Sequence, residues 1–134
     1  MKRYFAYGSN MDKQQMKDRC PQSEKQEKAE LSGYEFFINK RGVANIRPNK
    51  DKRVLGFIYN ITKDDEEKLD SFEGVQYGTN TKQNSIALNA FHYMAKEINE
   101  GQPREGYLEK IIKAAQVNDF PKEYVTELER WLNK

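Results

Sequence analysis

Cysteine, histidine and long apolar runs are scarce in this chain of 134 residues. Cys20 is the only cysteine, which excludes an internal disulfide and a thiolate metal cage. His92 is the only histidine and lies far from Cys20 in the sequence, so no local signature of a nucleophilic triad is present. No apolar run approaches the ~20 residues that span a bilayer, and Met1 to Arg3 do not resemble a secretory signal. We therefore expect a soluble, cytoplasmic protein without a membrane partner.

A strong charge of one sign is also lacking. The 23 basic and 21 acidic residues leave a formal charge of +2, and the two signs alternate along the chain. An RNA-binding barrel would require a strip of aromatic and basic side chains, so we expect no nucleic-acid partner. The glycine-rich motifs that cradle phosphates are absent as well, so nucleotide binding is unsupported.

Aromatic residues compensate for a modest apolar content. Hydrophobic residues make up 37% of the chain, but eight tyrosines and seven phenylalanines supply large areas for burial. The length suits one domain over residues 1–134 better than two.

The chain begins with an aromatic segment that ends in small polar residues. Tyr4 to Tyr7 are typical of a strand, and 12–19 of a short helix. Between them, Gly8 permits a positive φ and leaves no side chain between the backbone and a ligand. A small-residue turn before a helix exposes free N–H groups that bind a carboxylate or phosphate. An ordinary helix start is the alternative.

The remaining pattern predicts several strands followed by helices. Residues 79–84 are polar and form either a mobile loop or an edge strand. We expect His92 to be packed within a strand, rather than catalytic. Pro48 is expected to end a strand. The expected strands are 29–38, 43–46, 53–61 and 85–95, and the expected helices after 12–19 are 62–72, 104–117 and one following Pro121.

Acidic residues cluster at the predicted helix over 62–72. Thr62 is a typical N-cap, and the acidic residues at 64–67 suit the first turn of a helix. A metal site is the alternative, but four consecutive carboxylates point around a helix and do not converge. We expect no metal.

Glu73 follows this helix directly. A negative charge is disfavoured at a helix C-terminus, and Phe72 and Val75 are apolar neighbours, so we expect a raised pKa for Glu73. Asp70 could pair with Glu73 in a two-carboxylate site, but no second acidic cluster supports this. One carboxylate and one anion-binding loop remain, which together suit single-base chemistry on a small acidic molecule.

Three segments, in order along the chain, resemble the gamma-glutamylcyclotransferase family, which includes gamma-glutamylamine cyclotransferases and AIG2-like proteins. The first is Tyr4-Phe5-Ala6-Tyr7-Gly8-Ser9-Asn10-Met11. The second is Leu69-Asp70-Ser71-Phe72-Glu73-Gly74. The third comprises Tyr107 to Ile112 and Phe120 to Tyr124, which are similar to the closing helices of the family.

The resemblance implies an α+β fold, a single domain with a mixed, partly closed, barrel-like sheet and peripheral helices. It implies that a gamma-glutamyl group is cyclised to 5-oxoproline, with Glu73 as general acid and base, by a lyase or transferase without a cofactor. A small-molecule gamma-glutamyl substrate is then the expected partner of a monomer or homodimer. The implied substrate-binding residues are Tyr7, Gly8, Ser9, Asn10, Met11 and Tyr107.

One position departs from the family pattern. Many members have a tyrosine six or seven residues after the glutamate, where this chain has Thr79-Asn80. A non-catalytic small-molecule binding or interaction module of the same fold is therefore the alternative function.

Overall fold

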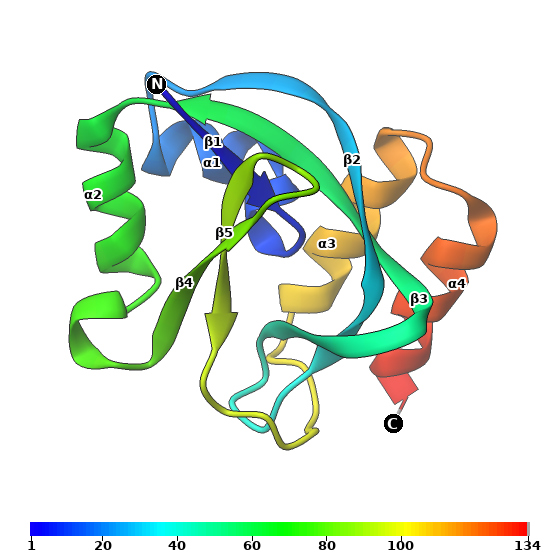
Figure 1. Cartoon of the computed structure of the whole chain (residues 1–134). Helices are drawn as coiled ribbons and strands as arrows, with labels where there is room; N and C mark the ends of the chain where they lie inside the picture. The colour runs from blue at the N-terminus through cyan, green and yellow to red at the C-terminus, as the bar shows by residue number, and fades with distance from the viewer. Residues whose placement is uncertain (134) are drawn as a thin grey trace.

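A mixed five-stranded sheet forms the centre of the molecule, with its strands in the order β2-β3-β1-β5-β4 (Figure 1). This computed structural model describes residues 1–133, without the side chains at 25, 26 and 133. β1 runs antiparallel to β3 and parallel to β5, so the N-terminal strand lies in the middle of the sheet. The strands are β1 Lys2–Ala6, β2 Glu24–Ile38, β3 Ala44–Ile61, β4 Asn80–Ser85 and β5 Ala90–Ala95.

Helices cover the sheet at both ends. In Figure 1, α2 lies on one side of the sheet and the pair α3 and α4 on the other. The predicted α+β class with a mixed, partly closed sheet is confirmed. The helices are η1 Ser9–Met11, α1 Lys13–Arg19, α2 Lys63–Phe72, η2 Val75–Tyr77, α3 Tyr107–Val117, α4 Lys122–Glu129 and η3 Arg130–Asn133. No helix in the described part of the chain is both long and apolar enough to cross a membrane.

β3 is longer than the sequence pattern predicts. Two strands separated at Pro48 were expected, but a single strand runs through this proline, and Pro48 pairs with Tyr34 of β2. β1 covers only the end of β3 at 57–61, so the stretch around Pro48 has a neighbouring strand on one side only. A proline is tolerated there because its missing N–H removes no bond on the unpaired side. A register shift between Ser32 and Tyr34 marks a bulge in β2 at Gly33.

Two other strand boundaries differ from the prediction. β2 begins at Glu24, because this charged edge segment pairs with β3 in spite of its low apolar content. Only 90–95 of the strand expected over 85–95 form a strand, β5, because a turn occupies 86–89. The polar segment before this turn is the edge strand β4, one of the two alternatives expected for 79–84, and it pairs with β5 as a hairpin. Asn89 has a φ of 50°, a left-handed conformation typical of asparagine in turns, and Ile86 is 97% exposed at the tip.

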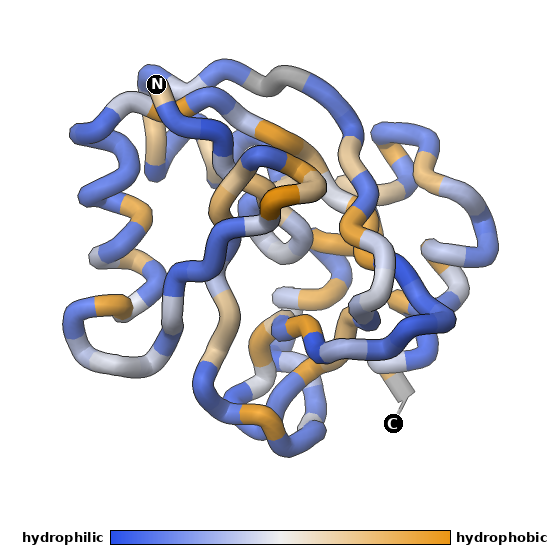
Figure 2. Tube along the Cα trace, viewed as in Figure 1, coloured by the Kyte–Doolittle hydropathy of each residue, from blue (hydrophilic) through white to orange (hydrophobic). Residues whose placement is uncertain are grey.

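Aromatic side chains hold the layers together. Figure 2 shows apolar segments concentrated where the sheet and helices meet, with hydrophilic segments on the outer turns. Phe57 of β3 packs against Phe120, which precedes α4, with ring centroids 5.2 Å apart and the rings tilted by 34°. Tyr4 of β1 contacts the ring of Phe91 on β5 at 5.3 Å. His92 is buried as predicted, and burial lowers its pKa.

Candidate active site

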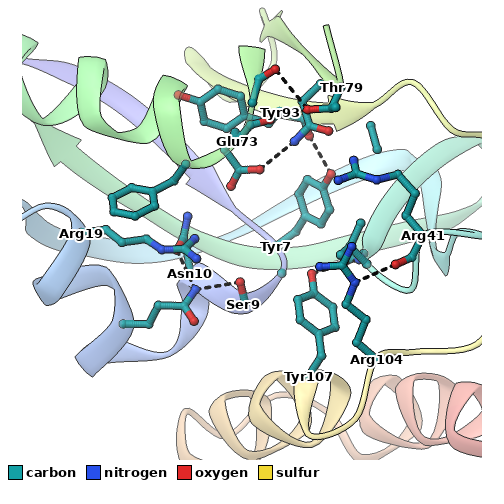
Figure 3. A pocket seen from close by; sticks show the side chains of 18 of the residues that line it. Tyr7, Ser9, Asn10, Arg19, Arg41, Glu73, Thr79, Tyr93, Arg104 and Tyr107 are labelled. Atoms are coloured by element: carbon teal, nitrogen blue, oxygen red, sulfur yellow. Dashed lines mark hydrogen bonds between the residues drawn. The ribbon is translucent and has the colours of Figure 1, made fainter. Parts of the chain in front are cut away.

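A cavity of about 370 Å³ opens where η1, the end of α2, the start of β4 and the start of α3 meet (Figure 3). Its lining combines backbone from the loop at residues 8–11 (the Gly8 loop), the Glu73 carboxylate and several phenol rings. Residues from the first and last quarters of the chain therefore share one wall, because β1 lies at the centre of the sheet.

Glu73 is the C-cap of α2 and is half-buried in the cavity wall. Gly74 follows it with a φ of 68°, a left-handed conformation, so the helix ends there. The hydroxyl of Thr79 donates to the carbonyl of Gly74 at 3.1 Å, and a Cβ at position 74 would overlap this hydroxyl. Glycine at 74 therefore lets the chain fold back and bring β4 beside Glu73.

Asn80 is the polar partner of Glu73. Its side-chain N–H donates to Oε2 of Glu73 at 2.8 Å, whereas its buried Oδ1 has no partner in the described part of the chain. Burial raises the pKa of Glu73, and the charge of Arg19 and the Asn80 bond oppose this rise. The predicted direction is confirmed. Phe72 is 59% exposed and stacks on Arg19, so it shields Glu73 less than expected.

The Gly8 loop presents unpaired backbone donors. Met11 N–H donates to the carbonyl of Gly8 and Asp12 N–H to that of Ser9, each at 3.0 Å. Within residues 1–133, the N–H groups of Gly8, Ser9 and Asn10 have no hydrogen-bond partner. Three neighbouring free donors beside a cavity suit an anion such as a carboxylate.

Gly8 serves this loop through its small size. Its φ is −115°, so the positive φ that glycine permits is not used. A Cβ there would lie 3.3 Å from Ala44 Cβ and 3.5 Å from the hydroxyl of Tyr107, and would narrow the cavity.

The Asn10 side chain holds the loop in place. Its Nδ2 donates to the hydroxyl of Tyr4 at 2.9 Å. Its Oδ1 accepts from Gln15 at 2.9 Å and from Arg19 at 3.1 Å. These bonds occupy the amide, so only the backbone N–H of Asn10 remains to bind a ligand.

Met11 does not line the cavity. Its side chain is 2% exposed in the core, and its N–H already bonds to Gly8. The geometry therefore gives no support to the expected substrate contact at Met11. The candidate anion site consists of Gly8, Ser9 and Asn10.

Two phenols shape the wall opposite Glu73. Tyr7 donates its hydroxyl to the carbonyl of Tyr93 at 2.6 Å, and the hydroxyl of Tyr107 accepts from the N–H of Ala44 at 3.0 Å. Burial, and secondarily the charge of Glu73, raise the pKa of both, to about 12 for Tyr107. Both phenols therefore stay neutral at physiological pH.

Asp70 lies behind the cavity wall and has other partners. It accepts from the Tyr93 hydroxyl at 2.6 Å and forms an ion pair with Lys82 at 2.8 Å. Lys82 also bonds to Glu66 at 2.7 Å, so α2 is tied to β4. Asp70 therefore supports α2, and the geometry does not favour a two-carboxylate site with Glu73.

The acidic start of α2 is a helix cap. The Thr62 hydroxyl accepts from the N–H of Asp65 at 3.1 Å, as predicted. Asp65 accepts from the backbone of Gln22, whereas Glu66 faces Lys82. Among the described residues, no group of three His, Cys, Asp or Glu side chains could hold a metal.

Several residues of the cavity lining carry no signal in the sequence, among them Gln15, Arg19, Arg41 and Arg104. Gln15 and Arg19 lie on the exposed side of a short helix pattern, and nothing in that pattern distinguishes them from solvated residues. Arg41 and Arg104 lie in polar turns, where only the tertiary structure brings them to the cavity.

Comparison with known proteins gives one family and several similar structures. The model of the AIG2-like family matches residues 53–128, more than half of the chain. No curated protein matches the sequence. A structure described as gamma-glutamyl cyclotransferase is 23% identical, with a TM-score of 0.82 over 96% of this chain and 86% of that one. An uncharacterized protein from Homo sapiens is 25% identical, with a TM-score of 0.78 over 95% and 85%.

A more distant structure comes from yeast. It is described as a gamma-glutamyl cyclotransferase specific to glutathione and is 14% identical, with a TM-score of 0.56 over 98% of this chain and 95% of that one. At such identities, the likeness shows the fold alone.

Proposed function

The chain belongs to the gamma-glutamylcyclotransferase (AIG2-like) family, and from this we propose that it cyclises a gamma-glutamyl compound to 5-oxoproline and releases an amine or amino acid. The observation that carries the proposal is the shared cavity: one carboxylate with a raised pKa, Glu73, lines the same space as the unpaired amides of the Gly8 loop. A base and an anion site are the two elements this reaction needs.

The nucleophile comes from the substrate itself. Glu73 takes a proton from the α-ammonium group, and the neutral amine attacks the γ-carbonyl carbon to close a five-membered ring. The bond from that carbon to the leaving nitrogen then breaks, as Glu73 returns its proton to this nitrogen. The ring nitrogen loses two protons in all and the released amine gains two, so no water, oxidant or cofactor is consumed.

The loop amides orient the substrate. The N–H groups of Gly8, Ser9 and Asn10 would bind the α-carboxylate, which holds the chain of the glutamyl group folded toward its own carbonyl. Tyr7 and Tyr107 remain neutral and provide the wall against which the folded chain rests. Positioning of this kind lowers the barrier without a protein nucleophile.

Release of 5-oxoproline tests the function directly. A panel of gamma-glutamyl amino acids and gamma-glutamyl amines should yield 5-oxoproline and the free amine in equal amounts. Binding of these compounds without release would favour a non-catalytic module of the same fold, for which Asn80 at the position of the family tyrosine is the motivating observation.

Asn80 should set the acid limb of the pH profile. Glu73 acts as a base only when ionised, and the bond from Asn80 favours that form. Asn80→Leu keeps the size but removes the donor, so the pKa of Glu73 should rise and activity at acidic pH should fall. The measurement is kcat/KM as a function of pH, and the expected result is an acid limb displaced toward higher pH.

A matched control lies on the same strand. Asn84 is exposed on β4, and Asn84→Leu should leave the pH profile unchanged. An unchanged acid limb in Asn80→Leu would show that Glu73 does not govern it.

A further inference from the structure

Basic residues outnumber acidic residues in the lining of the cavity. Three arginines, Arg19, Arg41 and Arg104, face a single carboxylate, Glu73. Arg19 is already engaged, because it donates to Asn10 at 3.1 Å and lies 4.8 Å above the ring of Phe72. Among the side chains that the structure describes, no carboxylate forms a salt bridge with the guanidinium of Arg41 or Arg104.

Hydrogen bonds to the backbone hold these two arginines next to each other. Nε of Arg104 donates to the carbonyl of Arg41 at 2.8 Å, and the N–H of Arg104 donates to Gly42 at 3.1 Å. Gly42 has a φ of 83°, and a Cβ there would lie 2.7 Å from Cγ of Arg104. The glycine thus allows the segment before α3 to pass directly over the β2–β3 turn.

The surrounding loops are tied to one another as well. Lys40 N–H donates to the carbonyl of Asn99 at 2.7 Å, and Gly101 N–H donates to that of Ile38 at 3.0 Å. Tyr107 N–H bonds to the carbonyl of Arg104 at 3.1 Å, so the turn that carries this arginine also starts α3. The guanidinium of Arg104 is therefore anchored through Nε, and its two terminal nitrogens remain available.

The pair lies away from the base. In Figure 3, Arg41 and Arg104 reach toward Tyr7 and Tyr107 from one side, whereas Glu73 and Arg19 lie on the other side of the view. A glutamyl group held by the Gly8 loop with its amine at Glu73 would direct its leaving group out of the cavity, past residues at the mouth. Arg41 and Arg104 are exposed residues of the lining and occupy such a position.

We propose that Arg41 and Arg104 form a carboxylate-recognition site for the leaving group, which makes gamma-glutamyl amino acids and peptides preferred substrates over gamma-glutamyl amines. This inference rests on the proposed cyclisation. Two neighbouring cations without a counter-ion repel each other, and a carboxylate relieves that repulsion. The planar guanidinium matches a carboxylate in geometry, which gives selectivity beyond simple charge.

Two compounds of nearly equal shape test the site. gamma-Glutamyl-alanine carries the carboxylate, and gamma-glutamyl-alaninamide replaces it with a neutral amide. The parent protein should have a kcat/KM about tenfold higher for the acid than for the amide. This factor corresponds to one charge-assisted hydrogen bond of ordinary strength, taken at the low end of the usual range. In the Arg41→Gln/Arg104→Gln protein, kcat/KM should fall for gamma-glutamyl-alanine and stay unchanged for the amide. The ratio of the two kcat/KM values should therefore approach one.

Two further variants guard against indirect effects. Arg41→Gln by itself leaves the bond from Arg104 to the carbonyl of residue 41 intact and should still lower the ratio. Arg53→Gln removes a partly exposed arginine that pairs with Glu30 and Glu123 outside the cavity, and should keep the parent ratio. Equal kcat/KM for both compounds in the parent, or a full preference in the double variant, would overturn the inference.

Binding separates this inference from the proposed reaction. Dissociation constants for both compounds should be measured by calorimetry on Glu73→Gln protein, with and without the two arginine substitutions. Tighter binding of the acid that depends on the arginines, without 5-oxoproline release by the parent, supports the site and contradicts the reaction. Equal release from both compounds supports the reaction and contradicts the site, and a failure of both to bind contradicts the two proposals together.

Discussion

Glu73→Gln is expected to lower kcat for 5-oxoproline release by about 10²–10⁴-fold, the usual contribution of a positioned acid and base. Glutamine has nearly the same shape and can still accept the bond that Asn80 donates to Oε2 at 2.8 Å. It cannot take a proton from the α-ammonium group. The measurement is steady-state release of 5-oxoproline, together with the dissociation constant of a gamma-glutamyl compound, which should change little.

The fold should tolerate this substitution. Because burial raises the pKa of Glu73 in the folded state, its carboxylate binds a proton more readily there than in the unfolded chain. Its stabilising contribution is therefore greatest at acidic pH, below its unfolded pKa, and is lost as pH rises through the folded pKa. At neutral pH the glutamine variant should be at least as stable as the parent.

Glu67→Gln is the matched control for this experiment. Glu67 lies on the same helix, is exposed and should retain full activity after the same change. If Glu73→Gln keeps most of the parent activity, the proton transfer assigned to Glu73 is wrong.

Trp131→Ala should lower the free energy of unfolding by about 3–5 kcal/mol, as expected for removal of a large buried aromatic side chain. Trp131 belongs to η3, is 7% exposed and packs in the main core. Chemical denaturation of the purified variant provides the measurement. A loss below about 1 kcal/mol would show that the C-terminal turn contributes little to the core.

Tyr107→Phe separates the structural role of the C-terminal helices from their role at the cavity. This change removes one hydroxyl, which accepts from Ala44 N–H, and should cost about 1 kcal/mol of stability. Substrate use should fall, because the hydroxyl also borders the Gly8 loop. Equal losses of stability in Tyr107→Phe and Trp131→Ala would contradict this division.

The parts of the fold that follow local rules could be predicted from the sequence. Thr62 caps α2 as its position indicates, and the stripe of apolar residues in α3 faces the core. Pro48 misled the strand prediction, because its effect depends on which side of β3 carries a neighbour. The hairpin around Asn89 was missed because alternating apolar residues continue through its turn.

The candidate site divides in the same way. Glu73 and Gly8 could be singled out because both occupy unusual local positions, a carboxylate at a helix end and a glycine after a strand. Arg41 and Arg104 could not, since their common position depends on contacts between segments far apart in the chain. Their proximity is a property of the tertiary structure alone.

The central place of β1 has a consequence for how the protein folds. Tyr4 pairs with Tyr59 of β3 on one side and with Phe91 of β5 on the other. Both partner strands are therefore far from β1 in the sequence. Such distant pairings must overcome a large loss of chain entropy before they stabilise anything, which makes folding slow. The Gly8 loop directly follows β1, so the cavity is complete only once β1 has paired with both of these distant strands.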